Sequence, residues 1–208
     1  MSAKSNDSSS LVRLVVIAVV VMVGLSRLSH NNTPSAGANQ THRVEANTVA
    51  TAPPAPAGSA QALAQQILST DSITYNDAET RNSFEQVASG QPATTTCDSA
   101  PVASVEVSPK LLRVILAISA QGIPLEFNAL VDACHTESSF HYRGLGVDII
   151  NARQVGEQVM TYVSNNRVAL DVNELFYNPY RELALDNGRP CNCVIANHDE
   201  HIHIGVNP

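Results

Sequence analysis

The segment that most constrains the fold is the C-terminal run from Asn197 to Val206, which reads NHDEHIHIGV. In an extended strand, successive side chains point to opposite faces of the sheet. His201 and His203 therefore share one face of the expected strand. Three apolar side chains line the opposite face: Ile202, Ile204 and Val206. This alternation predicts a strand whose apolar face is buried in a core and whose two imidazoles can bind a metal ion.

The rest of the folded chain predicts an α+β fold. Apolar periodicity, capping residues and Gly or Pro positions predict helices over 60–68, 78–88, 109–121 and 154–163. Alternating or apolar runs predict further strands over 73–75, 125–133 and 147–150, and the run 168–172 is ambiguous. We expect a small antiparallel sheet that carries the metal site, with the helices packed on one side. A hydrophobic content of 44% is sufficient for such a core.

The N-terminal 27 residues predict export of the rest of the chain. An apolar run of thirteen residues, 14–26, is flanked by Arg13 and Arg27. As a helix it would span about 20 Å, less than the roughly 30 Å hydrocarbon core of a bilayer. Snorkelling arginines could extend it into an uncleaved anchor, and a run of this length also suits a cleaved secretory signal. Both alternatives place the remainder outside the cytoplasm, membrane-anchored or secreted.

The composition divides the remainder into two parts. Residues 28–59 are rich in Asn, Thr, Ala and Pro and lack an apolar period, which predicts a disordered linker. Residues 60–208 form the expected folded domain. The formal net charge of −7 and the lack of a basic run argue against nucleic-acid binding. We expect a monomer whose contact with a membrane, if the N-terminal segment is uncleaved, is made through that segment.

Four cysteines in an exported chain favour two disulfides. They are Cys97, Cys134, Cys191 and Cys193. Cys191 and Cys193 are too close in an extended chain to bond easily, so each is expected to pair with Cys97 or Cys134, in either order. The competing interpretation is a metal site that uses Cys191 and Cys193, although metal-binding cysteine pairs usually have two to four intervening residues.

A second group of metal-ligand residue types lies upstream of the terminal strand. His141 and Asp148 are seven residues apart, with Gly144 and Gly146 between them. Glycines permit the tight backbone that lets two ligands meet. Asp148 stands alone in an apolar strand, where an unpaired carboxylate would be costly. Together with the terminal histidines it predicts a metal site rather than a satisfied polar cluster, and two imidazoles with one carboxylate suit zinc, leaving a fourth position for water.

These residues resemble a known family. Ser139-x-His141-x-x-Gly144-x-Gly146-x-Asp148 and the terminal Glu200-His201-x-His203 are similar to the motifs of the zinc peptidases of the lysostaphin, D-Ala-D-Ala metallopeptidase and hedgehog superfamily. The similarity is greatest to the D-alanyl-D-alanine carboxypeptidase and endolysin branch. It covers roughly residues 60–208, and the specific motifs occupy about 20 of them.

The resemblance implies a ligand set and a reaction. Zinc would bind His141, Asp148 and His203, with Glu200 as general base and His201 beside the transition state. The implied activity is hydrolysis of peptidoglycan peptides, as a carboxypeptidase or an endopeptidase. The alternative is a zinc-dependent binding module without hydrolysis, as in hedgehog-like members.

Several further residues near the motifs are assigned expected roles. Ser139 is expected to orient a ligand, and Asp199 is a rival to Glu200 as base. The family usually has an Arg before the first motif; none lies between Pro124 and His135, so Arg113 and Arg143 are the substitutes. His135 is expected to be structural and His198 to belong to a turn.

Overall fold

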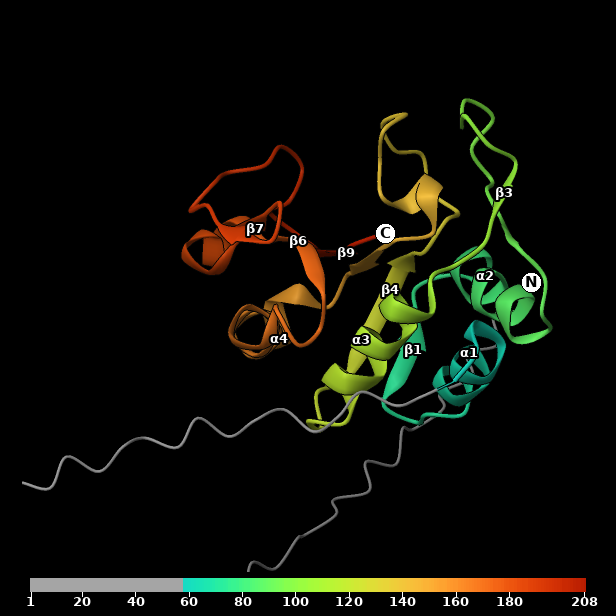
Figure 1. The fold of residues 1–208 in the computed structure, drawn as a ribbon, viewed down its shortest axis with the longest axis horizontal. Helices are drawn as coiled ribbons and strands as arrows, with labels where there is room; N and C mark the ends of the chain where they lie inside the picture. The colour runs from blue at the N-terminus through green and yellow to red at the C-terminus, as the bar shows by residue number, and fades with distance from the viewer. Residues whose placement is uncertain (1–57) are drawn as a thin grey trace, which may run out of the picture. The chain divides into compact units, whose positions relative to one another are not determined.

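Residues 58–208 are described by a computed structural model, and they form an α+β fold (Figure 1). The predicted signal or anchor at residues 1–27, and the predicted linker as far as residue 57, lie outside the described residues. Within residues 58–208 no helix combines the length and the apolar character needed to cross a membrane.

The helices and strands alternate irregularly along the chain. The helices are α1 (Ala60–Leu68), α2 (Ala78–Ala88), α3 (Pro109–Ser119) and α4 (Ala152–Asn166), with the 3₁₀ turns η1 (His141–Arg143) and η2 (Asn178–Leu183). The strands are β1 (Ile73–Tyr75), β2 (Ala93–Thr94), β3 (Ser104–Val105), β4 (Leu125–Ala129), β5 (Gly146–Ile149), β6 (Val172–Phe176), β7 (Leu185–Asp186), β8 (Arg189–Pro190) and β9 (Ile202–Val206). All four predicted helices are present, and α4 continues three residues beyond its predicted end.

The main sheet has seven strands in the order β1-β4-β5-β9-β6-β7-β8, and β2 pairs separately with β3. The C-terminal strand β9 therefore lies in the middle of the sheet, between β5 and β6. The prediction of a small antiparallel sheet is wrong in one respect, because β1 pairs parallel with β4 and the sheet is mixed. Helices α2 and α3 connect these two strands, and a helical crossover returns the chain in the same direction.

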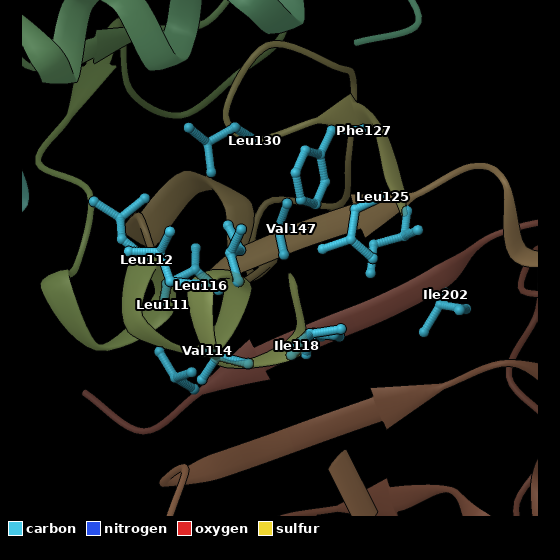
Figure 2. Packing of buried hydrophobic residues seen from close by; sticks show 14 of the residues in the cluster. Leu111, Leu112, Val114, Leu116, Ile118, Leu125, Phe127, Leu130, Val147 and Ile202 are labelled. Carbon is cyan, nitrogen blue, oxygen red and sulfur yellow. The ribbon is translucent and has the colours of Figure 1, made fainter. Parts of the chain in front are cut away.

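The apolar face of the sheet and the helices share one core (Figure 2). Ser108 caps the N-terminus of helix α3, because its hydroxyl accepts a hydrogen bond from the backbone N–H of Lys110, and Pro109 occupies the first turn. Nearly every later side chain of α3 is buried: Leu111, Leu112, Val114, Ile115, Leu116, Ala117 and Ile118. In β9 the predicted apolar residues, Ile202, Ile204 and Val206, belong to the same cluster. The predicted alternation of β9 is thus confirmed, and its other face is left for the site.

The predicted strand 125–133 ends early, at Ala129, because of a buried carboxylate. Asp132 Oδ1 accepts the backbone N–H groups of Leu130 and Val131, at 3.0 and 3.3 Å, which turns the chain out of the sheet. The hydroxyls of Thr80 and Ser83 on α2 donate to the same carboxylate, at 2.9 and 3.1 Å. Asp132 therefore fixes the segment that leads from β4 to the site.

Replacing Asp132 by Ala should destabilise the domain by about 3 kcal/mol, because two buried hydroxyls and two backbone N–H groups lose their acceptor. Urea unfolding followed by circular dichroism measures this change. The matched control is Asp98→Ala, an exposed aspartate, which should change the free energy of unfolding by less than about 0.5 kcal/mol. Equal stability of the two variants would contradict the role given to Asp132.

The four cysteines form two disulfides, as predicted, but the predicted pairing is wrong. Cys97 bonds to Cys134, and Cys191 bonds to Cys193. Between the latter two, Asn192 adopts a left-handed φ of 49°, which folds the chain back. The two Cα atoms are then 5.1 Å apart, whereas alternate residues of an extended strand are about 6.6 Å apart. The bonded pair also excludes the alternative of a metal site on these two cysteines.

Candidate metal centre

The strand register brings the two sequence motifs together. On the polar face of the sheet, Asp148 of β5 lies directly opposite His203 of β9. Phe176 of β6 lies opposite His203 on the other side. His141 stands at the start of η1, where its backbone N–H donates to the hydroxyl of Ser139 at 3.3 Å. Three residues after His141 the chain reverses at Gly144, whose φ of +67° suits glycine.

A side chain at Gly144 would also collide with the neighbouring backbone. A Cβ atom there would lie 2.1 Å from the carbonyl oxygen of Glu106. The glycine in the first motif therefore allows the turn after η1 to pack against the strand-to-helix connection before α3. This close approach places His141 over the sheet.

Three ligand-type atoms converge above the centre of the sheet. His141 Nε2 is 3.2 Å from Asp148 Oδ1 and 3.2 Å from His203 Nδ1. His203 Nδ1 is 2.8 Å from Asp148 Oδ1. All three side chains are buried. The atoms thus form a nearly equilateral triangle on the buried floor of the site.

The far ring nitrogens of both histidines are held by acceptors. His141 Nδ1 donates to the carbonyl oxygen of Leu130 at 2.8 Å, which leaves Nε2 facing the other two ligand atoms. His203 Nε2 lies 3.1 Å from Glu174 Oε2 on β6. Acceptors of this kind orient imidazole ligands and raise their basicity at metal sites. Each ring is therefore fixed with its other nitrogen directed to the common point.

The pKa shifts of Asp148 and His203 show how strongly these groups interact. Burial alone would raise the pKa of Asp148, but the charges and hydrogen bonds of His141 and His203 hold it well below its ordinary value. Burial alone would lower the pKa of His203, but its hydrogen bonds to Asp148 and Glu174 raise it to about 9. A proton on His203 thus offsets part of the charge of the two facing carboxylates, and a bound cation would take its place.

A further histidine stands next to this triangle. The ring of His135 stacks on that of His141, with 3.8 Å between centroids and 4° between planes. Its Nε2 atom is buried and has no hydrogen-bond partner among residues 58–208. Burial, together with the charge of His141, lowers the pKa of His135 to about 4, so this imidazole is neutral.

The triangle opens into a cavity of about 700 Å³ on the polar face. Its wall includes the rings of His135, His198 and His201, the carboxylate of Glu174, and the loop 195–197. Asn178 holds this loop: its backbone N–H donates to the carbonyl of His198 at 2.8 Å. Phe176 stacks on His203 and closes one side of the site. The cavity is therefore lined by imidazoles, carboxylates and an aromatic ring.

Two histidines on the cavity wall have lowered pKa values. Burial lowers the pKa of His198, partly opposed by the bond of its Nδ1 to the carbonyl oxygen of Ala196 at 2.8 Å. This bond makes Nδ1 the protonated nitrogen and leaves a lone pair on Nε2. Burial likewise lowers the pKa of His201, although Asp148 opposes it, with His201 Nε2 3.8 Å from Asp148 Oδ2. Both rings are neutral at neutral pH.

The other residues expected in the site lie outside the cavity. Glu200 forms an ion pair with Arg153 of α4 at 3.0 Å, and 74% of its side chain is exposed. Asp199 accepts a hydrogen bond from Asn178 Nδ2 at 3.0 Å. Arg143 lies over the ring of Phe140, 5.0 Å from its centroid, and Arg113 lines a separate small pocket beside α3. Of these predicted groups, the structure brings together only Ser139, His141, Asp148, His201 and His203.

Three cavity residues were not assigned a functional role from the sequence: His135, Glu174 and His198. Glu174 lies two residues beyond the run 168–172, whose structure was ambiguous; the signal available there was a carboxylate followed by two apolar residues, Leu175 and Phe176. His135 lies six residues before the motif histidine His141, and His198 lies three residues before His201. This proximity in the sequence was the signal that could have assigned them to the site.

One group of side chains in the cavity has the composition and spacing of a metal site. His135, His141 and Asp148 each offer a ligand atom within 4.8 Å of the other two, and such a group can hold a metal ion. His203 lies within hydrogen-bonding distance of two of them. No protein-family model, curated protein or solved structure matches the chain.

Proposed function

We propose that the protein is an exported zinc-dependent peptidase that hydrolyses internal bonds of peptidoglycan peptides. The observation that carries the proposal is the triangle of His141 Nε2, Asp148 Oδ1 and His203 Nδ1 on the floor of an open cavity. The peptidoglycan substrate comes from the motif resemblance. The N-terminal apolar segment and the two disulfides support an exported location.

The three ligand atoms fit zinc. Two ligands about 2.0–2.1 Å from a tetrahedral zinc ion are about 3.3 Å apart. The measured edges of the triangle are 2.8, 3.2 and 3.2 Å, so a small outward movement of the side chains accommodates the ion. Three protein ligands leave a fourth position that faces the cavity, as catalytic zinc sites require.

His198 is the general base that the geometry favours. Bound zinc would supply polarisation of the scissile carbonyl and would lower the pKa of a water molecule. The neutral ring of His198, with its proton on Nδ1, can take a proton from the attacking water at Nε2. It can then return this proton to the leaving amine. Glu200, the base implied by the resemblance, is instead paired with Arg153.

The cavity lining favours an endopeptidase over a carboxypeptidase. Among residues 58–208, no Arg or Lys lines the cavity. Recognition of a terminal carboxylate usually depends on an Arg or Lys side chain. The carboxylates of Asp148 and Glu174 on the floor would also repel a substrate carboxylate placed nearby. A peptide chain that continues through the open cavity avoids both difficulties.

The second candidate function is a zinc-dependent binding module without hydrolysis. The position of Glu200 favours it, because this carboxylate is paired with Arg153 and does not line the cavity. The two functions share the metal site and differ in turnover.

Purified peptidoglycan incubated with the full-length protein distinguishes these functions. We expect new amino groups to appear, to disappear with a zinc chelator and to return when zinc is added back. Mass spectrometry should show loss of cross-linked dimers while uncross-linked pentapeptide stems persist. Shortened stems with intact cross-links would indicate a carboxypeptidase, and zinc-loaded protein that releases no amines would indicate the binding module.

Glu174→Gln should weaken zinc binding about 10–100-fold, because Glu174 orients His203 and raises its basicity. Competition with a chromophoric chelator measures the affinity. The matched control is Glu182→Gln, an exposed glutamate of η2, which should leave the affinity unchanged. Unchanged affinity in Glu174→Gln would contradict the assignment of His203 as a ligand held through its second nitrogen.

A further inference from the structure

The proposed zinc site and base use three of the five histidines that line the cavity. His141 and His203 bind the first metal and His198 acts as base, which leaves His135 and His201. Both lie close to Asp148: a ring nitrogen of His135 is within 4.8 Å of its carboxylate, and His201 Nε2 is 3.8 Å from Oδ2. The two remaining histidines therefore flank the same carboxylate as the first site.

With the rings placed as they are, the stacking of His135 on His141 does not favour one ion bound by both. A ring nitrogen binds a metal along its in-plane lone pair, so parallel rings direct their ligand bonds along parallel planes. The two rings are 3.8 Å apart with 4° between their planes. The nitrogens of the two rings consequently lie in two parallel planes about one stacking distance apart. Paired metal ions in hydrolytic sites are about 3.5–4 Å apart, which matches this spacing.

Asp148 offers a separate oxygen to each position. Oδ1 faces His141 and His203, at 3.2 and 2.8 Å, whereas Oδ2 faces His201. Two ligand atoms that are each about 2.0–2.1 Å from one ion are separated by about 3.3–4.1 Å, depending on the angle at the ion. The distance of 3.8 Å between His201 Nε2 and Asp148 Oδ2 lies in this range.

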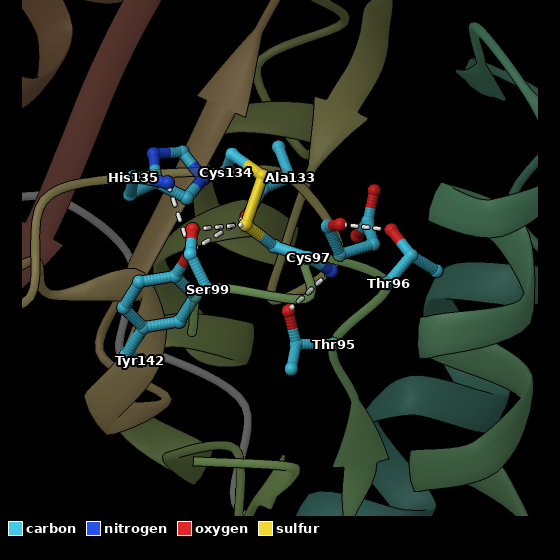
Figure 3. The surroundings of a disulfide bond; sticks show 9 residues. Thr95, Thr96, Cys97, Ser99, Ala133, Cys134, His135 and Tyr142 are labelled. Carbon is cyan, nitrogen blue, oxygen red and sulfur yellow. Dashed lines mark hydrogen bonds between the residues drawn. A yellow bond between two sulfur atoms is a disulfide. The ribbon is translucent and has the colours of Figure 1, made fainter. Parts of the chain in front are cut away.

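The ring of His135 is held in place by its neighbours (Figure 3). The preceding residue, Cys134, is bonded to Cys97. The backbone N–H of His135 donates to Tyr142 Oη at 2.9 Å, and this hydroxyl donates to the carbonyl of Ala133 at 3.1 Å. Its Nε2 nevertheless remains buried without a partner among the described residues. A fixed imidazole with an unpartnered buried nitrogen has the properties of a metal ligand.

We infer that His135, Asp148 and His201 form a second divalent-metal site, with Asp148 bridging it to the first. The inference rests on the proposed zinc site at His141, Asp148 and His203. Two imidazoles and a carboxylate suit zinc and cobalt(II). A second ion in this position would lie on the cavity side of the first, where it could bind a carbonyl oxygen or the leaving group of a substrate.

Titration of the metal-free full-length protein with cobalt(II) tests the inference. Visible absorption of bound cobalt follows occupancy, and elemental analysis after desalting gives the number of ions per chain. We expect saturation at two equivalents. His135→Phe keeps a ring stacked on His141 but removes both ring nitrogens, and His201→Phe removes the other imidazole. Each variant should saturate at one equivalent, and the control His198→Phe should saturate at two.

The outcomes separate the second site from the first. Saturation of the parent protein at one equivalent would overturn the second site and leave the first intact, whereas no cobalt binding would overturn both. Loss of all binding in His135→Phe, with a native circular dichroism spectrum, would show that His135 belongs to a single site and would also overturn the inference. If His135→Phe does not fold, His201→Phe alone decides, because one equivalent supports the second site and two equivalents refute it.

Discussion

Replacing Asp148 by Ala should weaken zinc binding by more than the roughly 10–100-fold that the loss of an outer-shell partner costs, and should abolish hydrolysis. Asp148 is the only carboxylate among the three proposed ligands of the first site, and both histidines contact it. Without it, two imidazoles remain, which cannot neutralise the charge of the ion. Isothermal titration of the metal-free variant with zinc measures the effect.

The substitution of Asp148 by Ala should also change the pKa of His203 in the metal-free protein. His203 is buried, and Asp148 together with Glu174 raises its pKa to about 9. Removal of Asp148 should therefore lower the pKa of His203, which NMR titration of the imidazole signals can follow. The matched control is Asp186→Ala, an exposed aspartate of β7. A variant Asp148→Ala that binds zinc as tightly as this control would refute the proposed ligand set.

His198→Ala should lower turnover by about 10²–10⁴-fold, the usual contribution of a general base, while zinc binding stays close to that of the parent protein. The ring is not among the three proposed ligands, and its Nε2 lone pair is available to accept a proton. Steady-state release of amino groups from peptidoglycan measures turnover, and chelator competition measures zinc.

Comparison of the turnover of Glu200→Gln with that of His198→Ala decides which residue is the general base. Because Glu200 is exposed and paired with Arg153, this variant should keep turnover near that of the parent protein. If Glu200→Gln instead loses turnover and His198→Ala does not, then Glu200 is the base, as the resemblance implies. That outcome would also require the ion pair with Arg153 to open during the reaction.

The polar and apolar faces of the central strand were predictable because they depend only on alternation along the chain. His203 and Asp148 lie on the same face for this reason, and the register of β5 with β9 places them opposite one another. The helix starts were predictable for a similar reason, since Ser59, Asp77 and Ser108 act as local caps. Alternation and capping involve residues that are close in the sequence, whereas the pairing of β5 with β9 joins residues 55 positions apart.

The features that were missed depend on contacts between distant segments. Strand β9 begins only at Ile202, and before it the chain bends, so Glu200 meets Arg153 of α4 instead of the cavity. Glu174 reaches His203 because β6 pairs with β9, an arrangement that the composition of residues 168–176 does not specify. The stacking of His135 on His141 similarly follows from the turn after β4, where Asp132 ends the strand.

The zinc site itself is tested most directly by a crystal structure of the zinc-loaded protein, with anomalous scattering measured on both sides of the zinc edge. We expect a strong anomalous peak about 2 Å from each of His141 Nε2, Asp148 Oδ1 and His203 Nδ1. Zinc-loaded crystals with no anomalous peak at these three atoms would contradict this expectation.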